Sequence, residues 1–482
     1  MCPALARPPY QIDPMPLSSD AMSFLCNGER PISSIRGTSK LRRVAVLATA
    51  FFSLVSLSRD AACDWLEFRG GNGDGFVARN DLPVRWGGLF RQPVWSTPIP
   101  GQGWSSPIVI GDSIWLSSAE VTALPDALAT KKLEENQYGP TDFQTHGTVA
   151  LLAIELNATD GSIVRTIALG KIEKPVPIHS MNSYASPTPC SDGERIVFHF
   201  GTLGTYCIRS TGELLWQLRF ELDDITGPAT SPILRNGLVY LACDGTDHQY
   251  VAAVDVQSGQ EKWRTPRPPI DTARGAERRA FSTPLIIEHK GLQQLLSPCA
   301  QWLVSYDPIR GNENWRCRIG SGHALVPRVV YQDGVAFACS GYMRPELFAI
   351  QVGGHGDVSE THVKWSWKRQ VPEVASPALI GDSICFVSSM GIATCLSQRD
   401  GVQRWQERLP GSYAASPTVT GGLVYFTNQS GVTTVIRPGN QMETVAVNEL
   451  FGETLASFAV HNDAFLIRTH PLLHYVRRTD LD

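Results

Sequence analysis

The chain has 482 residues, of which 43% are hydrophobic and 18% are charged. This share of apolar side chains supplies a sizeable core and excludes a generally disordered polymer. The 42 lysines and arginines are balanced by 46 aspartates and glutamates, for a net charge of −4. Such a chain lacks the basic surface that binding to a nucleic-acid backbone requires, so we expect no nucleic-acid partner.

Residues 1–62 are typical of a signal or targeting segment. Basic residues at 40–43 precede the apolar run 44–57, whose fourteen residues suit a signal peptide and are too few to span a bilayer. We therefore expect an exported protein, periplasmic or extracellular, without a transmembrane span in the mature chain. Cys63 leaves attachment of a lipid anchor open as an alternative.

Two markers recur through the rest of the chain. The first is a residue, usually small, followed by proline ahead of an apolar segment, and the second is a turn glycine with tryptophan four residues later. Their interval of roughly 45 residues is typical of the blade of a β-propeller. The prolines are Pro107, Pro187, Pro232, Pro284, Pro327, Pro377 and Pro417, and the glycines are Gly212, Gly259, Gly311 and Gly401.

The unit that begins at Ser231 shows the content of one repeat. Its apolar segments at 231–234, 238–243, 250–256 and 261–265 are separated by turns that contain Asn-Gly, Asp-Gly and Ser-Gly. These dipeptides favour tight hairpins, because the turns require positive φ angles. The unit therefore predicts four short antiparallel strands.

Eight such units over residues 92–482 predict one all-β domain, a single eight-bladed β-propeller with four-stranded antiparallel blades. The eighth inner strand, expected within 457–466, lacks the proline, and its unit ends after a third strand. A strand at Trp95 precedes the first unit. We therefore expect an N-terminal outer strand to complete the C-terminal blade and close the ring, which removes open sheet edges. Residues 63–91 form an N-terminal extension ahead of the ring.

The cysteines and acidic residues do not predict a metal site. None of the 11 cysteines is adjacent to another or arranged as C-x-x-C. Cys385 and Cys395 are expected to face each other across a hairpin, either as a disulfide or as packed thiols. Asn72 and Asp74 resemble half a calcium loop, but the terminal glutamate is missing, which favours a plain turn.

Loop chemistry divides the predicted disc into two faces. Connections such as Asp192-Gly193 are tight turns, and we name their side the short-turn face. The opposite, long-loop face carries long polar and aromatic connections, including 119–147, in which 127–136 predict a surface helix. Such loops on a rigid scaffold usually bind ligands. We expect a site at the channel mouth on the long-loop face, with candidates His179, Asn182, Asp247, His248, Arg278, Trp302, His323, Arg328, Tyr342, Arg344 and Glu346.

Several candidates have a purely structural alternative. Arg344 and Glu346 are two residues apart, so they are alternatively an ion pair with each other. Trp302 alternatively fills the gap between two blades instead of stacking on a planar ligand. The loop histidines are alternatively solvated or bonded to the backbone.

The repeats resemble those of the pyrroloquinoline quinone (PQQ)-like β-propellers. Val254–Trp263, with the sequence VDVQSGQEKW, is similar to their tryptophan-docking motif. That superfamily includes quinoprotein alcohol dehydrogenases and BamB, a lipoprotein of outer-membrane barrel assembly. Other segments are similar to exported bacterial PQQ-binding-like propellers, whose name records a fold and not a bound quinone. These segments are 64–70, 179–183, 326–328 and 341–347.

The residues and the resemblance lead to three functional hypotheses. The first is a monomeric, non-catalytic exported scaffold that binds a protein, a peptide or a saccharide and needs no cofactor. The resemblance also implies a PQQ- and calcium-dependent oxidoreductase, with Trp104 or Trp302 as a stacking floor. The third is a BamB-like factor at the outer membrane. The chain lacks the adjacent cysteines of many quinoprotein alcohol dehydrogenases, and no calcium ligands match, so we expect no catalytic residues.

Overall fold

The computed structural model describes residues 64–88, 90–136 and 141–478. They belong to one compact unit that spans Arg59–Asp482. The expected targeting segment 1–62 and Cys63 lie outside the described residues. In the described part of the chain, no helix has the length and apolar character needed to cross a membrane.

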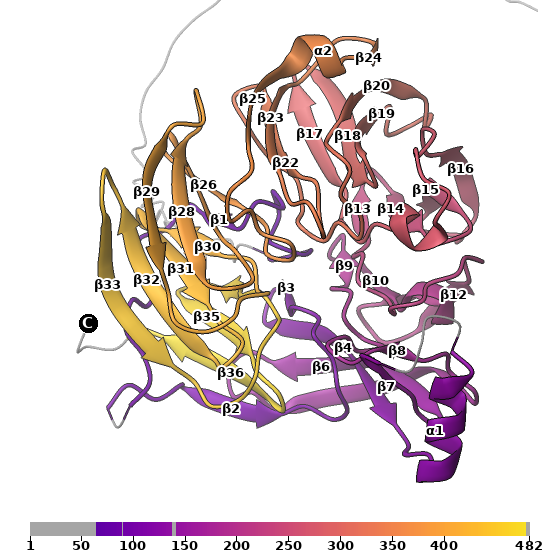
Figure 1. Ribbon diagram of the computed structural model, residues 1–482. Helices are drawn as coiled ribbons and strands as arrows, with labels where there is room; N and C mark the ends of the chain where they lie inside the picture. Colours follow the sequence, from indigo (N-terminus) through magenta and orange to yellow (C-terminus); the bar gives the residue numbers. More distant parts are fainter. Residues whose placement is uncertain (1–63, 89, 137–140, 479–482) are drawn as a thin grey trace, which may run out of the picture. The chain divides into compact units, whose positions relative to one another are not determined.

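Eight sheets, each with four antiparallel strands as its blade, are arranged around a common centre (Figure 1), which confirms the predicted eight-bladed β-propeller. The first blade contains β3 (Ile108–Ile110), β4 (Ser113–Val121), β6 (Val149–Asn157) and β7 (Ile163–Ile172), and the second contains β9 (Cys190–Ser191), β10 (Arg195–His199), β11 (Thr205–Arg209) and β12 (Leu214–Leu218). The third contains β13 (Ile233–Arg235), β14 (Leu238–Asp244), β15 (Gln249–Asp255) and β16 (Glu261–Pro266), and the fourth contains β17 (Leu285–His289), β18 (Leu292–Cys299), β19 (Trp302–Tyr306) and β20 (Glu313–Arg318). The fifth blade contains β21 (Val330–Gln332), β22 (Val335–Cys339), β23 (Leu347–Gln351) and β25 (Val363–Trp367), and the sixth contains β26 (Ala378–Ile380), β27 (Ser383–Val387), β28 (Ile392–Ser397) and β29 (Gln403–Arg408). The seventh contains β30 (Thr418–Thr420), β31 (Leu423–Thr427), β32 (Val432–Pro438) and β33 (Met442–Glu449).

The eighth blade joins the two ends of the ring. It contains β34 (Ala459–His461), β35 (Ala464–Arg468) and β36 (Leu472–Arg477), with β2 (Trp95–Pro98) as its outermost strand. β2 pairs antiparallel with β36, so that Trp95 lies opposite Tyr475. Figure 1 shows the two strands side by side, although they come from opposite ends of the described chain. The predicted closure of the ring is confirmed.

Short elements decorate the blades. The insertion between β4 and β6 contains α1 (Asp126–Glu134), close to the predicted helix, and β5 (Phe143–Gln144) pairs with β8 (Ile178–His179). The others are β1 (Phe76–Val77), β24 (Gly356–Asp357), α2 (Ser359–His362) and the 3-10 helices η1 (Gly201–Leu203) and η2 (Gly275–Arg278).

Cys385 and Cys395 face each other across β27 and β28, as expected. Both are buried and carry free thiols, so the alternative of two packed thiols is the one observed. They belong to an apolar core that continues from the sixth blade into the seventh. Their place in the sheet therefore explains their pairing without a covalent bond.

Tryptophans of the fourth strands connect neighbouring blades. The indole N–H of Trp263 donates to the carbonyl of Pro308 in the next blade at 3.1 Å. The Trp263 ring also occupies the space where a Cβ on Gly311 would lie, 2.5 Å away. The turn glycine of the repeat thus leaves room for the tryptophan of the preceding blade. Equivalent pairs are Trp95 with Gly161, Trp216 with Gly259 and Trp365 with Gly401.

A ring of hydroxyl side chains connects the inner strands around the channel. In seven blades, the residue two positions before the inner strand is serine or threonine, and its hydroxyl accepts a hydrogen bond from the backbone N–H of the equivalent residue in the preceding blade. These bonds, all between described residues, measure 2.9–3.1 Å. We name this set the hydroxyl ring: Ser106, Thr188, Ser231, Thr283, Ser376, Ser416 and Ser457.

The hydroxyl ring corrects the register of two repeat markers. In the second blade the equivalent pair is Thr188-Pro189 and not Ser186-Pro187, and in the fifth blade it is Arg328-Val329 and not Val326-Pro327. Proline therefore precedes six of the eight inner strands, not seven. The predicted register was wrong because each of these two segments has a proline, Pro187 or Pro327, in the dipeptide just before the equivalent pair.

Replacing Gly311 with alanine tests the contact between blades, and Gly237 provides a matched control. Both glycines have φ of +76°, but nothing lies within 4 Å of a Cβ at Gly237. We expect Gly237→Ala to lower the free energy of unfolding by about 1 kcal/mol through backbone strain alone. Gly311→Ala should cost about 2 kcal/mol more, because it also displaces Trp263. Urea unfolding measures both, and equal losses would contradict a docking role for the tryptophan.

Candidate functional site

The N-terminal extension enters the channel near the short-turn face. The backbone of Trp65 exchanges hydrogen bonds of 2.9 and 3.0 Å with Val109 on the inner strand of the first blade. The carbonyl of Leu66 then accepts from Ser191 of the second blade, and β1 pairs in parallel with β30 of the seventh. Residues 64–77 therefore contact inner strands on different sides of the channel. We name this segment the plug.

Arg328 holds the plug from the eighth position of the hydroxyl ring. Its guanidinium lies 2.9 Å from a carboxylate oxygen of Glu67 and donates to the carbonyl of Phe68 at 2.6 Å. It also donates to the carbonyl of Pro284 at 2.8 and 3.1 Å. Arg328 has no hydroxyl that could accept a hydrogen bond from the backbone N–H of Thr283 in the fourth blade. Its bonds to the carbonyl of Pro284 connect the fifth blade to the fourth instead. A charged side chain replaces one ring hydroxyl and fixes the plug.

The ions of the plug are buried. Glu67 is 2% exposed, and its second carboxylate oxygen pairs with Arg235 of the third blade at 2.9 Å. Arg69, also 2% exposed, donates to the carbonyls of Asp74 and Pro377. Burial lowers the pKa of the Arg69 guanidinium to about 9 and also lowers the pKa of Arg328. Glu67 is therefore the carboxylate that compensates Arg328 in this buried cluster.

The glycine-rich part of the plug packs closely against the guanidinium groups of Arg328 and Arg69. A Cβ at Gly73, where φ is +69°, would lie 2.5 Å from the guanidinium carbon of Arg328. Asp74 accepts a hydrogen bond from the backbone N–H of Phe76 at 2.9 Å, as in a turn. The segment that resembles half a calcium loop thus packs around Arg328, and its glycine is explained by this close approach.

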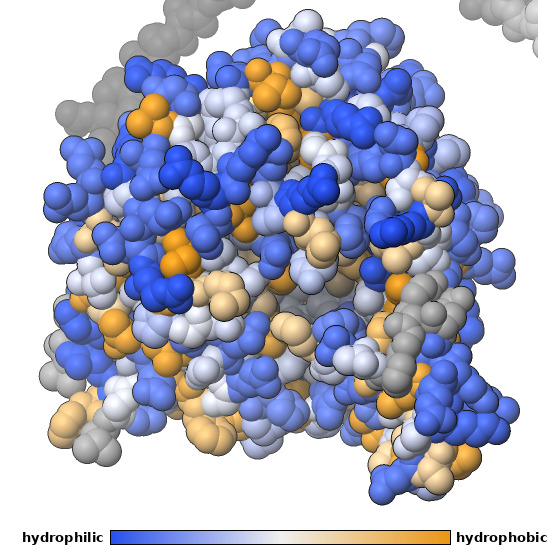
Figure 2. Space-filling view, in the orientation of Figure 1, coloured by the Kyte–Doolittle hydropathy of each residue, from blue (hydrophilic) through white to orange (hydrophobic). Residues whose placement is uncertain are grey.

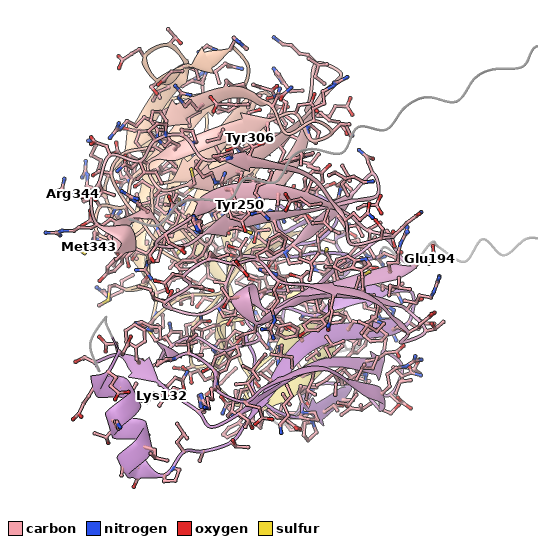
Figure 3. The ribbon with its side chains drawn as sticks, turned by 90° about the vertical axis from the view of Figure 1, so that its right-hand side faces the viewer. Lys132, Glu194, Tyr250, Tyr306, Met343 and Arg344 are labelled. Atoms are coloured by element: carbon pink, nitrogen blue, oxygen red, sulfur yellow. The ribbon has the colours of Figure 1, made fainter. Side chains whose placement is uncertain are left out.

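Beyond the plug, the channel opens as a funnel. This cavity of ≈ 330 Å³ has Phe68 of the plug in its lining together with residues of the hydroxyl ring. The face shown in Figure 2 is hollowed near its centre. Lys132, Met343 and Arg344 lie on one side of the disc and Glu194 on the other (Figure 3), in agreement with the predicted long-loop and short-turn faces.

A second ring of residues forms the wall of the funnel. In every blade, the residue two positions before the hydroxyl-ring position lines the cavity, and most of these side chains are apolar. The described lining contains no aspartate, glutamate, lysine or arginine. We name this set the wall ring: Trp104, Ser186, Ala229, Phe281, Val326, Val374, Ala414 and Leu455.

A groove continues from the funnel across the long-loop face. Its hollow of ≈ 370 Å³ shares Trp104, Met181 and Asn182 with the funnel and extends to Glu453 and His470. The aromatic edge of Trp104 meets His470, with ring centroids 6.3 Å apart. Polar side chains therefore begin where the apolar wall ends.

Two of the predicted site residues lie in the funnel. His179 belongs to β8, where it pairs with Phe143, and lines the cavity. Asn182 also lines it, and its amide donates to the carbonyl of Thr226 at 2.8 Å while its oxygen accepts from Ser186 at 2.5 Å. These bonds hold Asn182 in a fixed orientation at the mouth.

Three candidates form a separate group at the rim. His323 and Tyr342 meet edge to face with centroids 5.9 Å apart, and burial lowers the pKa of His323, helped by the nearby Arg279. Tyr342 is 50% exposed, and Arg344 projects from the same loop. None of the three lines the funnel as described.

Glu346 and Trp302 have structural partners. Glu346 pairs with Lys368 at 3.5 Å, so the suggested ion pair with Arg344 is not observed. Trp302 is buried and donates to the carbonyl of Pro269 at 3.0 Å. The guanidinium carbons of Arg316 and Arg318 each lie 5.5 Å from its ring centroid. It fills space in the fourth blade and does not line the funnel.

The remaining candidates lie elsewhere. Arg278 donates to the carbonyl of Thr272 in its own loop, whereas Asp247 and His248 are exposed at the turn after β14. Arg328 is 1% exposed and lies against the plug, inside the channel and not at its mouth. Sequence reasoning selected residues by chemical type and missed the wall ring. An alignment of the repeats on the hydroxyl ring would have found it.

One family model matches this chain, and two solved structures are similar to it. The family model described as outer membrane protein assembly factor BamB matches residues 152–407. The crystal structure of BamB from Moraxella catarrhalis is 12% identical, covers 81% of this chain and 99% of its own, and superimposes with a TM-score of 0.55. Quinohemoprotein alcohol dehydrogenase from Comamonas testosteroni is 10% identical, with 78% and 76% covered and a TM-score of 0.49. No curated protein matches the chain.

Replacing Glu67 tests the charge balance of the plug. We expect Glu67→Gln to lower the free energy of unfolding by about 3–5 kcal/mol, because Arg328 is then buried without its carboxylate. The double variant Glu67→Gln/Arg328→Met should recover part of this loss. Urea unfolding gives the energies, and limited proteolysis followed by mass spectrometry reports release of residues 64–77. A single variant as stable as the parent would contradict this account.

Proposed function

The chain belongs to the family described as outer membrane protein assembly factor BamB, and on this premise we propose that it is a non-catalytic binding propeller of the bacterial cell envelope. Its partner is a polypeptide that places an apolar side chain in the funnel. The observation that carries the proposal is a channel plugged near one face and open, with an apolar wall, on the other.

The shape of the funnel favours binding of a side chain over passage of a solute. Phe68 lies in its lining, and the backbone of Phe68 is bonded to the buried Arg328. A cavity of ≈ 330 Å³ has room for one or two large side chains. Because the wall ring is mostly apolar, burial of such a side chain contributes roughly 1.5–3 kcal/mol.

The rim favours a protein partner. Four large apolar side chains in connections of the long-loop face are 55–81% exposed: Met181, Met343, Met390 and Phe451. Methionine side chains adapt to varied apolar surfaces, and exposed apolar residues around a hollow are typical of interaction sites. The family assignment also supports a protein partner and a periplasmic or outer-membrane location.

The funnel residues do not fit the quinoprotein alternative. PQQ is a tricarboxylic acid, and its calcium requires oxygen ligands, mainly carboxylates. The described funnel lining offers no lysine or arginine to the quinone and no aspartate or glutamate to the metal. The guanidinium of Arg69 is bonded to the carbonyls of Asp74 and Pro377, and that of Arg328 to the carbonyl of Phe68 in the plug. We therefore propose no oxidoreductase activity and no PQQ cofactor.

Site-specific photo-crosslinking in the native host tests the proposal. A benzoylphenylalanine at position 181 or 390 should capture a protein partner, whereas the same residue at position 194 of the short-turn face should not. Ala229→Trp fills the funnel and should reduce capture at least tenfold with an unchanged thermal unfolding midpoint. Equal capture from both faces, or capture that Ala229→Trp leaves unchanged, would refute the funnel as the site.

A further inference from the structure

A second cavity lies on the short-turn face, apart from the funnel. It has a volume of ≈ 360 Å³ and lies between residues 80–91 of the extension and the seventh blade. The extension is held there by Tyr425, whose hydroxyl donates to the carbonyl of Pro83 at 3.2 Å, and by Thr420, whose hydroxyl donates to the carbonyl of Arg79 at 2.6 Å. The cavity is thus part of a packed junction.

Three arginines from separate parts of the chain line this cavity. Arg85 and Arg91 belong to the extension, and Arg478 follows β36. The described lining contains no aspartate or glutamate. Arg85 and Arg478 are exposed, and Arg85 donates to the carbonyl of Val445 at 3.0 Å, which directs it along the junction. Asp81, which lies between Asn80 and Leu82 of the lining, is bound through both carboxylate oxygens by Arg79. Arg79, and more weakly Arg478, lower the pKa of the Asp81 carboxyl.

Exposed apolar side chains adjoin the arginines. Phe90 precedes Arg91 directly and is 80% exposed, and Val94 is 58% exposed. The backbone N–H of Gly87 donates to the carbonyl of Arg91 at 2.7 Å, which closes a turn that contains Phe90. An aromatic side chain at an exposed turn beside basic residues is typical of proteins that rest on a lipid surface. A free anion would account for the arginines but not for Phe90.

We propose that the short-turn face docks on a membrane that contains anionic phospholipid. The cavity between Arg85, Arg91 and Arg478 holds a lipid phosphate, since guanidinium groups bind phosphate through paired, charge-assisted hydrogen bonds. Phe90 enters the interface beside it. The long-loop face and its funnel then point away from the lipid. This inference does not depend on the identity of the funnel partner.

Vesicle co-sedimentation tests the proposal. Every protein carries Cys63→Ser, so that no acyl chain contributes to binding. We expect binding to vesicles of phosphatidylglycerol and phosphatidylcholine that weakens as salt is raised, and little binding to phosphatidylcholine alone. Arg85→Gln/Arg91→Gln/Arg478→Gln should reduce vesicle affinity about a hundredfold, at roughly fivefold for each arginine. Phe90→Ser should reduce it several-fold without a change in charge.

The matched control removes three arginines elsewhere. Arg274, Arg310 and Arg399 are exposed and pair with neighbouring acids, so Arg274→Gln/Arg310→Gln/Arg399→Gln has the same net charge as the test variant. Equal affinities of the two triple variants would overturn the proposal. Tight binding of inorganic phosphate without vesicle binding would also overturn it. If replacement of Arg91 impairs folding, Arg85→Gln/Arg478→Gln alone should still lose about twenty-fivefold.

Discussion

The hydroxyl ring is the constraint on which the channel depends. Each blade presents one backbone N–H toward the next, and the acceptor must be short enough to leave the channel open. Serine and threonine meet this requirement in seven blades. Arg328 is the exception, and its guanidinium donates to the carbonyl of Pro284 instead. Its charge is buried inside the channel, and a buried charge requires a partner of opposite sign. A single departure from the repeat therefore recruits Glu67 and, with it, the whole plug.

The plug converts a repetitive disc into a molecule with two unlike faces. Eight similar blades produce a channel that is in principle open at both ends, and nothing in the repeat distinguishes its two mouths except loop length. The contact of Phe68 with Arg328 closes the channel near the short-turn face and leaves a funnel on the other. The wall ring contributes apolar residues of different sizes, from Ala229 to Trp104, so the funnel is asymmetric although its scaffold is regular.

Local sequence patterns predicted the blades well, whereas the plug and the funnel depend on contacts between residues that are distant in the sequence. Hairpins depend on turn residues that are adjacent in the chain, so the strands of the third blade were expected within two residues of where they lie. The contact between Glu67 and Arg328 spans 261 positions and follows no period. Arg328 was selected for its charge and assigned to the mouth, whereas its register places it inside. Val326 and Leu455 line the funnel, but isolated apolar residues carry no chemical signal of their own.

The extension outside the repeats therefore determines both special surfaces of the protein. Its first part supplies Phe68 to the funnel, and its second part supplies Arg85, Arg91 and Phe90 to the short-turn face. Between them, β1 joins the inner strand β30, so the two parts share one anchor on the seventh blade. The bonds of this anchor are backbone hydrogen bonds at the otherwise unpaired inner edge of a sheet, and they do not depend on side-chain identity. The two parts of the extension thus diverge from one shared anchor, which separates the chemistry of the funnel from that of the opposite face.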